Sequence, residues 1–100
     1  MNTYTPLPER TEKVVTQVVD AIFKVHKTLG PGLLESVYET CLCYELRQRG
    51  LKVESQVVIP IIYGDIRLEA GLRLDLLVEN EVVVELKAVE KMLPVFEARF

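Results

Sequence analysis

The sequence predicts one α/β domain in which two N-terminal helices pack on a three-stranded antiparallel meander. Two stretches with helical spacing of apolar residues lie before residue 50, and runs that alternate between apolar and polar residues follow. The chain has 100 residues, of which 49% are hydrophobic and 27% are charged. This length and composition fit a single globular domain with one core, and not a disordered chain.

The first helix is predicted from Thr11 to Leu29, after an extended N-terminal arm of residues 1–10; the single domain then spans residues 11–100. Gly30-Pro31-Gly32 ends the helix, because proline cannot continue it and glycine suits the exit turn. The one histidine, His26, is expected to be packed in this helix in a structural role. The helix is amphipathic because its apolar residues recur at helical spacing, at Val14, Val18, Ile22, Val25 and Leu29.

The second helix is predicted from about Leu33 to Arg49, with Gly50 as its cap. Its apolar arc is wide, which is typical of a mostly buried helix. Glu35 and Glu45 fall inside that arc. Each carboxylate therefore needs a hydrogen-bond partner such as a tyrosine, an opening to water, or a metal ion.

A strand is predicted from Lys52 to about Tyr63, and Pro60 marks it as an edge strand or a bulged one. Gly64-Asp65 is a two-residue turn signal that pairs Tyr63 with Ile66. The sheet then has one apolar face for the helices and one face with polar side chains. Continuing the register predicts two further facing pairs, Gln56 with Arg73 and Glu54 with Asp75.

Residues 71–91 form the central hairpin of the predicted sheet, with Glu79-Asn80-Glu81 as its loop. The apolar residues of its two strands share a face only if the loop has three residues, so that Val78 pairs with Val82. A slip of one residue would turn a whole strand to the wrong face. The allowed register places Asp75 opposite Glu85 and Arg73 opposite Lys87.

The like-charged pair of Asp75 and Glu85 is destabilising unless something compensates it. Two carboxylates about 5 Å apart form a half-cage for a hard cation such as Mg²⁺, which keeps several waters and binds substrate phosphate. Lys87, two residues after Glu85, would then hold a phosphate or steady the attacking nucleophile. The alternative is a solvated sheet face on which Lys87 and Arg73 neutralise the two acids.

The charge and the cysteines argue against several classes of protein. A net charge of −3 and a pI of about 5.2 argue against a basic protein that binds duplexes non-specifically. No apolar run approaches ~20 residues, and residues 1–10 lack the apolar core of a signal peptide, so neither a membrane span nor a leader is expected. Cys41 and Cys43 are too close on one helix to bridge easily, which favours reduced thiols and a cytoplasmic protein.

The stretch from His26 to Tyr38 resembles the signature of the GxxExxY protein family, whose named positions fall on Gly32, Glu35 and Tyr38. The likeness covers roughly residues 12–98. It continues through Glu45-Leu46, Gly50, Gln56, Arg73-Leu74-Asp75 and Glu85-Leu86-Lys87. That family is grouped with the PD-(D/E)xK nuclease-like superfamily, so the resemblance implies a restriction-endonuclease-like core.

By this resemblance Asp75 and Glu85 would bind the metal ion, Lys87 would be the catalytic lysine, and Glu35 would be the helix acid near the site. The implied function is that of a Mg²⁺-dependent (or Mn²⁺-dependent) phosphodiesterase acting on nucleic acid. The hairpin register places the first three of these residues on one face without reference to the family. The alternative is a catalytically silent module that associates with other proteins or with itself.

Two departures from the family pattern bear on activity and assembly. Family members usually carry a glutamine early in the last helix, where this chain has Arg99. They also continue through that helix, expected here to start near Pro94, and through one more strand, so the core is expected to be truncated at Phe100. An open sheet edge and a cut-off apolar helix predict a homo-oligomer, at its simplest a dimer, that buries Pro94, Val95, Phe96 and Phe100.

Overall fold

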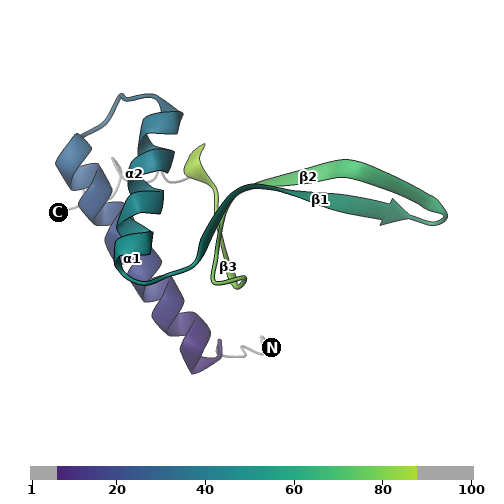
Figure 1. Cartoon of the computed structure of the whole chain (residues 1–100), viewed down its shortest axis with the longest axis horizontal. Coiled ribbons are helices and arrows are strands. Elements are labelled where there is room, and N and C mark those ends of the chain that lie inside the picture. Colours follow the sequence, from purple (N-terminus) through teal and green to yellow (C-terminus); the bar gives the residue numbers. More distant parts are fainter. Residues whose placement is uncertain (1–6, 88–100) are drawn as a thin grey trace, which may run out of the picture.

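The computed structural model describes residues 7–87 and confirms the predicted α/β arrangement of two helices and a three-stranded antiparallel sheet. The helices are α1 (Glu9–Leu29) and α2 (Glu35–Gln48). The strands are β1 (Val53–Tyr63), β2 (Ile66–Val78) and β3 (Val82–Val84), in the spatial order β1-β2-β3. Figure 1 shows both helices at one end of the sheet and the β1–β2 ribbon extending away from them. The predicted helix near Pro94 and the position Arg99 lie outside the described residues.

Helix α1 begins at Glu9, two residues earlier than predicted. Pro8 stands at its N-cap, and its carbonyl accepts the first helical hydrogen bond from the Glu12 N–H (3.0 Å). Glu9 and Arg10 therefore belong to the helix and not to the predicted arm, of which residues 1–6 lie outside the described residues. Glu9 and Glu12 also place negative charge at the helix end that carries partial positive charge, which favours a start here.

Tyr38 holds the turn between the two helices. Its hydroxyl donates to the Gly30 carbonyl (2.5 Å) and accepts from the Leu33 N–H (3.2 Å). Leu34, the N-cap of α2, has an extended backbone, so α2 starts at Glu35, two residues after the predicted start. A side chain of α2 thus closes the loop that precedes it and fixes the angle between the helices.

Helix α2 ends at its predicted glycine. Gly50 has φ 80°, a conformation that favours glycine, and its N–H donates to the Arg47 carbonyl (2.9 Å). The Leu51 N–H donates to the Leu46 carbonyl (3.1 Å). This pair of bonds is a Schellman motif, which satisfies carbonyls at the helix end and directs the chain towards β1.

The core lies between α1, α2 and the base of the sheet, where Leu46, Leu76 and Val78 are completely buried. His26 of α1 is only 4% exposed, as its predicted packed position requires. The alternate apolar residues of β2 and β3 share the face that meets the helices, as the predicted hairpin register demands. The other buried apolar residues are Val14, Val18, Ala21, Ile22, Val25, Leu42, Cys43, Val53, Val84 and Leu86.

Both predicted turns have the expected register. Tyr63 pairs with Ile66 across Gly64-Asp65, and Val78 pairs with Val82 across the three-residue loop. Gly64 has φ 58°, which suits the first central position of a tight hairpin turn. The ends of β2 are therefore where the sequence places them.

Between these two turns, the β1–β2 register shifts between Ile59 and Ile61. Pro60 lies at the shift and cannot donate a ladder hydrogen bond. Across the sheet, a Cβ atom on Gly71 would lie 2.0 Å from Cγ1 of Ile61, so glycine is what lets the two strands approach at this point. The predicted pairs of Gln56 with Arg73 and of Glu54 with Asp75 are consequently wrong by two residues. The observed pairs are Val58 with Arg73 and Glu54 with Leu77, and the pairs that flank Gln56 place it opposite Asp75.

The loop after β2 is held to the rest of the fold by Glu79. Its backbone has φ 53°, which is unusual for a non-glycine residue. The Glu79 carboxylate accepts from the Lys52 N–H (2.6 Å) and from the Arg10 guanidinium (3.3 Å), and its own N–H donates to the Lys52 carbonyl (2.8 Å). The hydrogen bond from the Lys52 N–H lowers the pKa of Glu79, burial opposes it with a smaller effect, and Arg10 lowers the pKa further.

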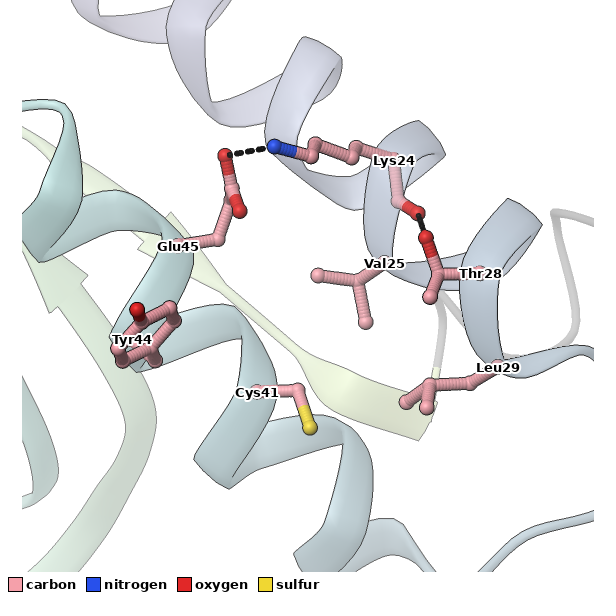
Figure 2. Close-up of a pocket in the computed structure, with 7 residues that line it drawn as sticks. All are labelled: Lys24, Val25, Thr28, Leu29, Cys41, Tyr44 and Glu45. Atoms are coloured by element: carbon pink, nitrogen blue, oxygen red, sulfur yellow. Dashed lines mark hydrogen bonds and ion pairs between the residues drawn. The ribbon is translucent and has the colours of Figure 1, made fainter.

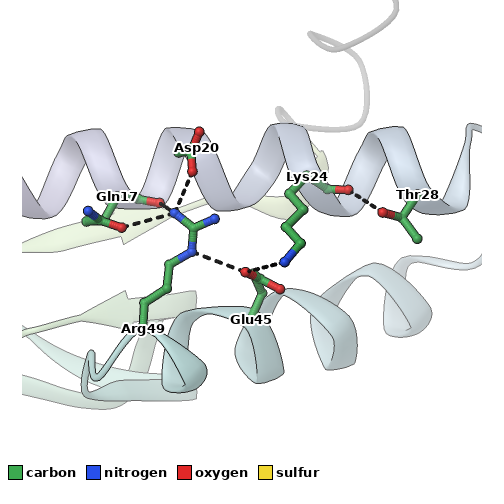
Figure 3. A network of polar contacts seen from close by, with 6 residues as sticks. All are labelled: Gln17, Asp20, Lys24, Thr28, Glu45 and Arg49. Atoms are coloured by element: carbon green, nitrogen blue, oxygen red, sulfur yellow. Dashed lines mark hydrogen bonds and ion pairs between the residues drawn. The ribbon is translucent and has the colours of Figure 1, made fainter.

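A polar cluster joins α1 to α2 across their exposed side (Figure 3). The Arg49 guanidinium donates to Asp20 Oδ2 (2.7 Å), to Gln17 Oε1 (3.0 Å) and to Glu45 Oε2 (3.2 Å). Lys24 also pairs with Glu45 Oε2 (3.3 Å). Burial raises the pKa of Glu45, but the hydrogen bonds from Lys24 and Arg49 outweigh it and the net pKa is lowered. Glu45 lies within the apolar arc of α2 and therefore needs a partner. The structure supplies two cations, Lys24 and Arg49.

We expect the melting temperature to fall as the pH drops below about 4.3, the usual pKa of a glutamate. The pKa values of Glu45 and Glu79 are lowered in the folded protein, so the folded state binds fewer protons than the unfolded chain. Their contribution is fully present above the usual value and is lost as the pH falls through the folded pKa. Glu79→Gln should flatten the dependence, while Glu54→Gln, at an exposed position of β1, should not. Melting curves between about pH 3 and pH 7 measure this, and equal flattening in both variants would contradict it.

Candidate active site

Asp75 lies on β2 near the base of the β1–β2 ribbon and is half-buried. Its neighbour Leu76 is completely buried against the helices. Because side chains alternate along a strand, Asp75 belongs to the opposite face of the sheet. This is the face on which the sequence predicts the polar residues.

Strand β3 is shorter than predicted, because it ends at Val84 and the backbone of Leu86 and Lys87 is helical. The physical reason lies in the Asp75 carboxylate, whose Oδ2 accepts a hydrogen bond from the Leu86 N–H (3.0 Å). An aspartate that accepts a backbone N–H competes with the ladder and favours the start of a helix. The chain turns here with Leu86 still only 3% exposed in the core. The predicted ladder pairs of Asp75 with Glu85 and of Arg73 with Lys87 are therefore wrong.

The same hydrogen bond brings Asp75 close to the segment that carries Glu85. Because Asp75 Oδ2 is bonded to the nitrogen of Leu86, the carboxylate lies against the Glu85–Leu86 peptide. The last ladder pair is Leu76 with Val84, so Asp75 and Glu85 are the next residues along the two paired segments. The backbone of Glu85 thus lies beside the Asp75 carboxylate, although not through the predicted ladder.

The donor chemistry here fits a hard divalent cation. A carboxylate has about four lone-pair positions, so one hydrogen bond from Leu86 leaves Asp75 able to bind a cation. Glu85 is exposed and supplies a second carboxylate. Among residues 7–87 there is no group of three or more His, Cys, Asp or Glu side chains that could hold a metal ion. A cation bound to two carboxylates, with backbone, water or phosphate oxygens as further ligands, is the arrangement that Mg²⁺ favours.

The other two predicted site residues, Lys87 and Glu35, lie on the segment after β3 and on α2. Lys87 is exposed and follows Glu85 by two residues, but on helical backbone, so the alternation of a strand does not set its direction. Glu35 is the first residue of α2 and is half-buried. Its carboxylate is at the helix end that carries partial positive charge, which stabilises an acid there whether or not it meets a substrate.

The structure places Gln56, which the family likeness already includes, in this region and adds Glu39 to it. Gln56 lies opposite Asp75 and has φ 55°, a left-handed conformation inside a strand that costs energy for a non-glycine residue. Its Nε2 donates to Glu39 Oε2 (3.0 Å), which ties β1 to α2. Glu39 follows Glu35 by one helical turn, so helical spacing could have drawn attention to it. The backbone of Gln56 has no local signal in the sequence.

A separate open pocket lies between the two helices (Figure 2). Its apolar part is lined by Val25, Leu29 and Cys41, and the ion pair of Lys24 and Glu45 lies at its edge. None of the predicted site residues lines it. The remaining lining residues are Thr28 and Tyr44.

The two cysteines of α2 are free thiols in different surroundings. Cys41 is half-buried and lines the pocket, whereas Cys43 is buried in the core. Burial raises the pKa of the Cys43 thiol, partly offset by Arg47, so this thiol is kept in its unreactive protonated form. This agrees with a structural role for Cys43.

Comparison with known proteins identifies one family. A family model described as the PD-(D/E)XK nuclease superfamily matches residues 12–100, which is most of the chain. No match was found among curated proteins or among solved structures. In the part of the chain that the structure describes, neither helix is long and apolar enough to cross a membrane.

Proposed function

Because the chain belongs to the PD-(D/E)XK nuclease superfamily, we propose that it is a Mg²⁺- or Mn²⁺-dependent phosphodiesterase that acts on nucleic acid. The observation that carries this proposal is the Asp75 carboxylate held against the Glu85–Leu86 peptide, with Lys87 directly after it. In the proposal, the side chains of Glu85 and Lys87 join the Asp75 carboxylate at this point. This is the set of groups that metal-assisted phosphate hydrolysis needs.

In this proposal Asp75 and Glu85 hold the cation, and the Leu86 carbonyl is a further oxygen donor. The bound cation would polarise the phosphate and lower the pKa of a coordinated water. Lys87 binds the scissile phosphate and stabilises the negative charge that develops on it. Glu35 is the acid that α2 contributes to the reaction.

We place the chain in the GxxExxY group of this superfamily. The structure gives two of the three named positions a physical role that supports this. Gly32 has φ 88°, which favours glycine, and the Tyr38 hydroxyl bridges the Gly30 carbonyl and the Leu33 N–H. The free thiols of α2 suit a reducing compartment, and we propose a cytoplasmic location on that ground.

Thermal melting of wild type and Asp75→Asn, in EDTA and in excess Mg²⁺ or Mn²⁺, tests the metal site. The wild type should gain about 2.7 kcal/mol at a metal concentration near a hundred times the dissociation constant, and Asp75→Asn almost nothing. Asparagine keeps an oxygen that accepts from the Leu86 N–H, so in EDTA the variant should lose no more than about 1 kcal/mol. Asp65→Asn, at the exposed turn between β1 and β2, is the matched control and should respond to metal as wild type does. A wild type whose melting temperature is the same in EDTA and in both metals would refute the metal site.

The second candidate function is a catalytically silent module that acts by association with another protein or with itself. The observation that favours it is the large apolar surface of the β1–β2 ribbon, where Ile62, Tyr63 and Ile66 are more than half exposed. A protein that binds no metal and cleaves no nucleic acid, yet self-associates, would support this alternative.

A further inference from the structure

Six apolar side chains form a continuous exposed surface on one face of the β1–β2 ribbon, which we call the apolar stripe. They come from three directly facing pairs, and the two side chains of each pair share a face. Their exposed fractions run from 37% for Ile59 to 77% for Tyr63. The pairs are Ile59 with Leu72, Ile61 with Leu68, and Tyr63 with Ile66.

The apolar stripe continues the core face of the sheet. Val53 and Val78, which face each other at the base of the same two strands, are buried under the helices. Leu72 lies an even number of residues from Val78 in the regularly paired part of β2, so Leu72 and Ile59 share this face. The extra residues of the register shift are on β2, so the alternation is followed along β1, where Ile61 and Tyr63 are again an even number of residues from Ile59. Figure 1 shows that the helices cover only the base of the ribbon. Within residues 7–87, the outer part is therefore a core face without a covering layer.

The charges of the ribbon lie on its other face. Arg73 faces Val58 and Arg67 faces Ile62, and neither pair belongs to the apolar stripe. The stripe itself contains no charged residue. An uncharged face has no electrostatic attraction for phosphate groups. Its partner is therefore another apolar surface and not nucleic acid.

The ribbon also needs support. A two-stranded hairpin alone in water is marginally stable, and strands become stable when a face is packed against another layer. Six large apolar residues exposed to this extent offer on the order of 600 Å². Two such surfaces together bury roughly 1,200 Å², the lower limit for a specific protein interface.

We propose that a second copy of this chain covers the apolar stripe, stripe against stripe, about a two-fold axis. A two-fold axis supplies an identical uncharged face of the same length without any other partner. The two ribbons stack face to face about 10 Å apart, as the two layers of a β-sandwich do. Weak and transient interfaces are typical of this lower size limit, so we expect monomer and dimer to exchange in the micromolar range.

Sedimentation velocity of the full chain, from about 1 to 300 μM, measures this equilibrium, because a micromolar dimer dissociates within that range. The wild type should change from monomer to dimer with concentration. Ile66→Glu, on the apolar stripe, should weaken the dimer by at least about tenfold because it buries an unpaired carboxylate between the copies. Ile62→Glu is the matched control, since Ile62 is on the opposite face and is even more exposed (68% against 57%). It should dimerise as wild type does.

Both residues lie beside the Gly64-Asp65 turn of the β1–β2 ribbon, which extends away from the helices (Figure 1). Circular dichroism melts should therefore show the same folded domain for both variants. A wild type that stays monomeric at the highest concentration would overturn the proposal, and so would equal weakening by both substitutions. A dimer that survives Ile66→Glu but is lost in Phe96→Glu would move the interface to residues 94–100. That segment is where the sequence predicts the contact, and it lies outside the described residues. None of these readouts depends on nuclease activity.

Discussion

Lys87→Ala is expected to lower the rate of nucleic-acid cleavage by about 10²–10³-fold, which is the effect of removing one charge-stabilising group from an active site. Lys87 follows directly after the Glu85–Leu86 peptide against which the Asp75 carboxylate lies, and in the proposed site its ammonium group binds the phosphate that the cation holds. It is not itself one of the two carboxylates that hold the cation. The dissociation constant for Mg²⁺ or Mn²⁺ should therefore change by no more than a few-fold.

The measurement is single-turnover cleavage of a mixed panel of single- and double-stranded DNA with Mn²⁺, together with calorimetric titration of the metal. Lys27→Ala is the matched control, because Lys27 is an exposed lysine near the end of α1. An active Lys87→Ala protein would mean that another residue holds the phosphate. A wild type inactive on every substrate would favour the silent module.

Leu46→Ala is expected to destabilise the fold by about 3–5 kcal/mol, which is typical of leucine truncation in a packed core. Leu46 is 0% exposed and belongs to the core cluster formed by both helices and the sheet. Removing its side chain leaves a cavity in a domain whose total stability is of the order of 5–15 kcal/mol. The melting temperature and the urea midpoint should both fall sharply.

Urea denaturation followed by circular dichroism measures the loss. Leu34→Ala is the matched control, since Leu34 is 74% exposed at the N-cap of α2 and should cost less than about 0.5 kcal/mol. Similar losses in the two variants would contradict the packing of α2 against the sheet.

The sequence by itself determined the elements whose signals are local. The helical spacing from Val14 to Leu29 predicted α1, and Gly50 marked the end of α2. The three-residue length of the loop followed from the requirement that the apolar residues of both strands face the core. A loop one residue shorter or longer would turn the apolar residues of one strand away from the core. The same register predicted Asp75 opposite Glu85; that ladder pair is wrong, but the Leu86 N–H donates to Asp75, so the two segments lie side by side.

Only the tertiary structure decided how they meet. Whether β3 continues past Val84 depends on a competition between the backbone ladder and the side chain of Asp75, which is distant in the sequence. The register of the outer ribbon depends on Pro60 and on the space that Gly71 leaves for Ile61 across the sheet. The cation that reaches Glu45 from the other helix is Lys24 of α1. In each case the deciding contact joins residues far apart in the chain, and the period of a local pattern carries no information about it.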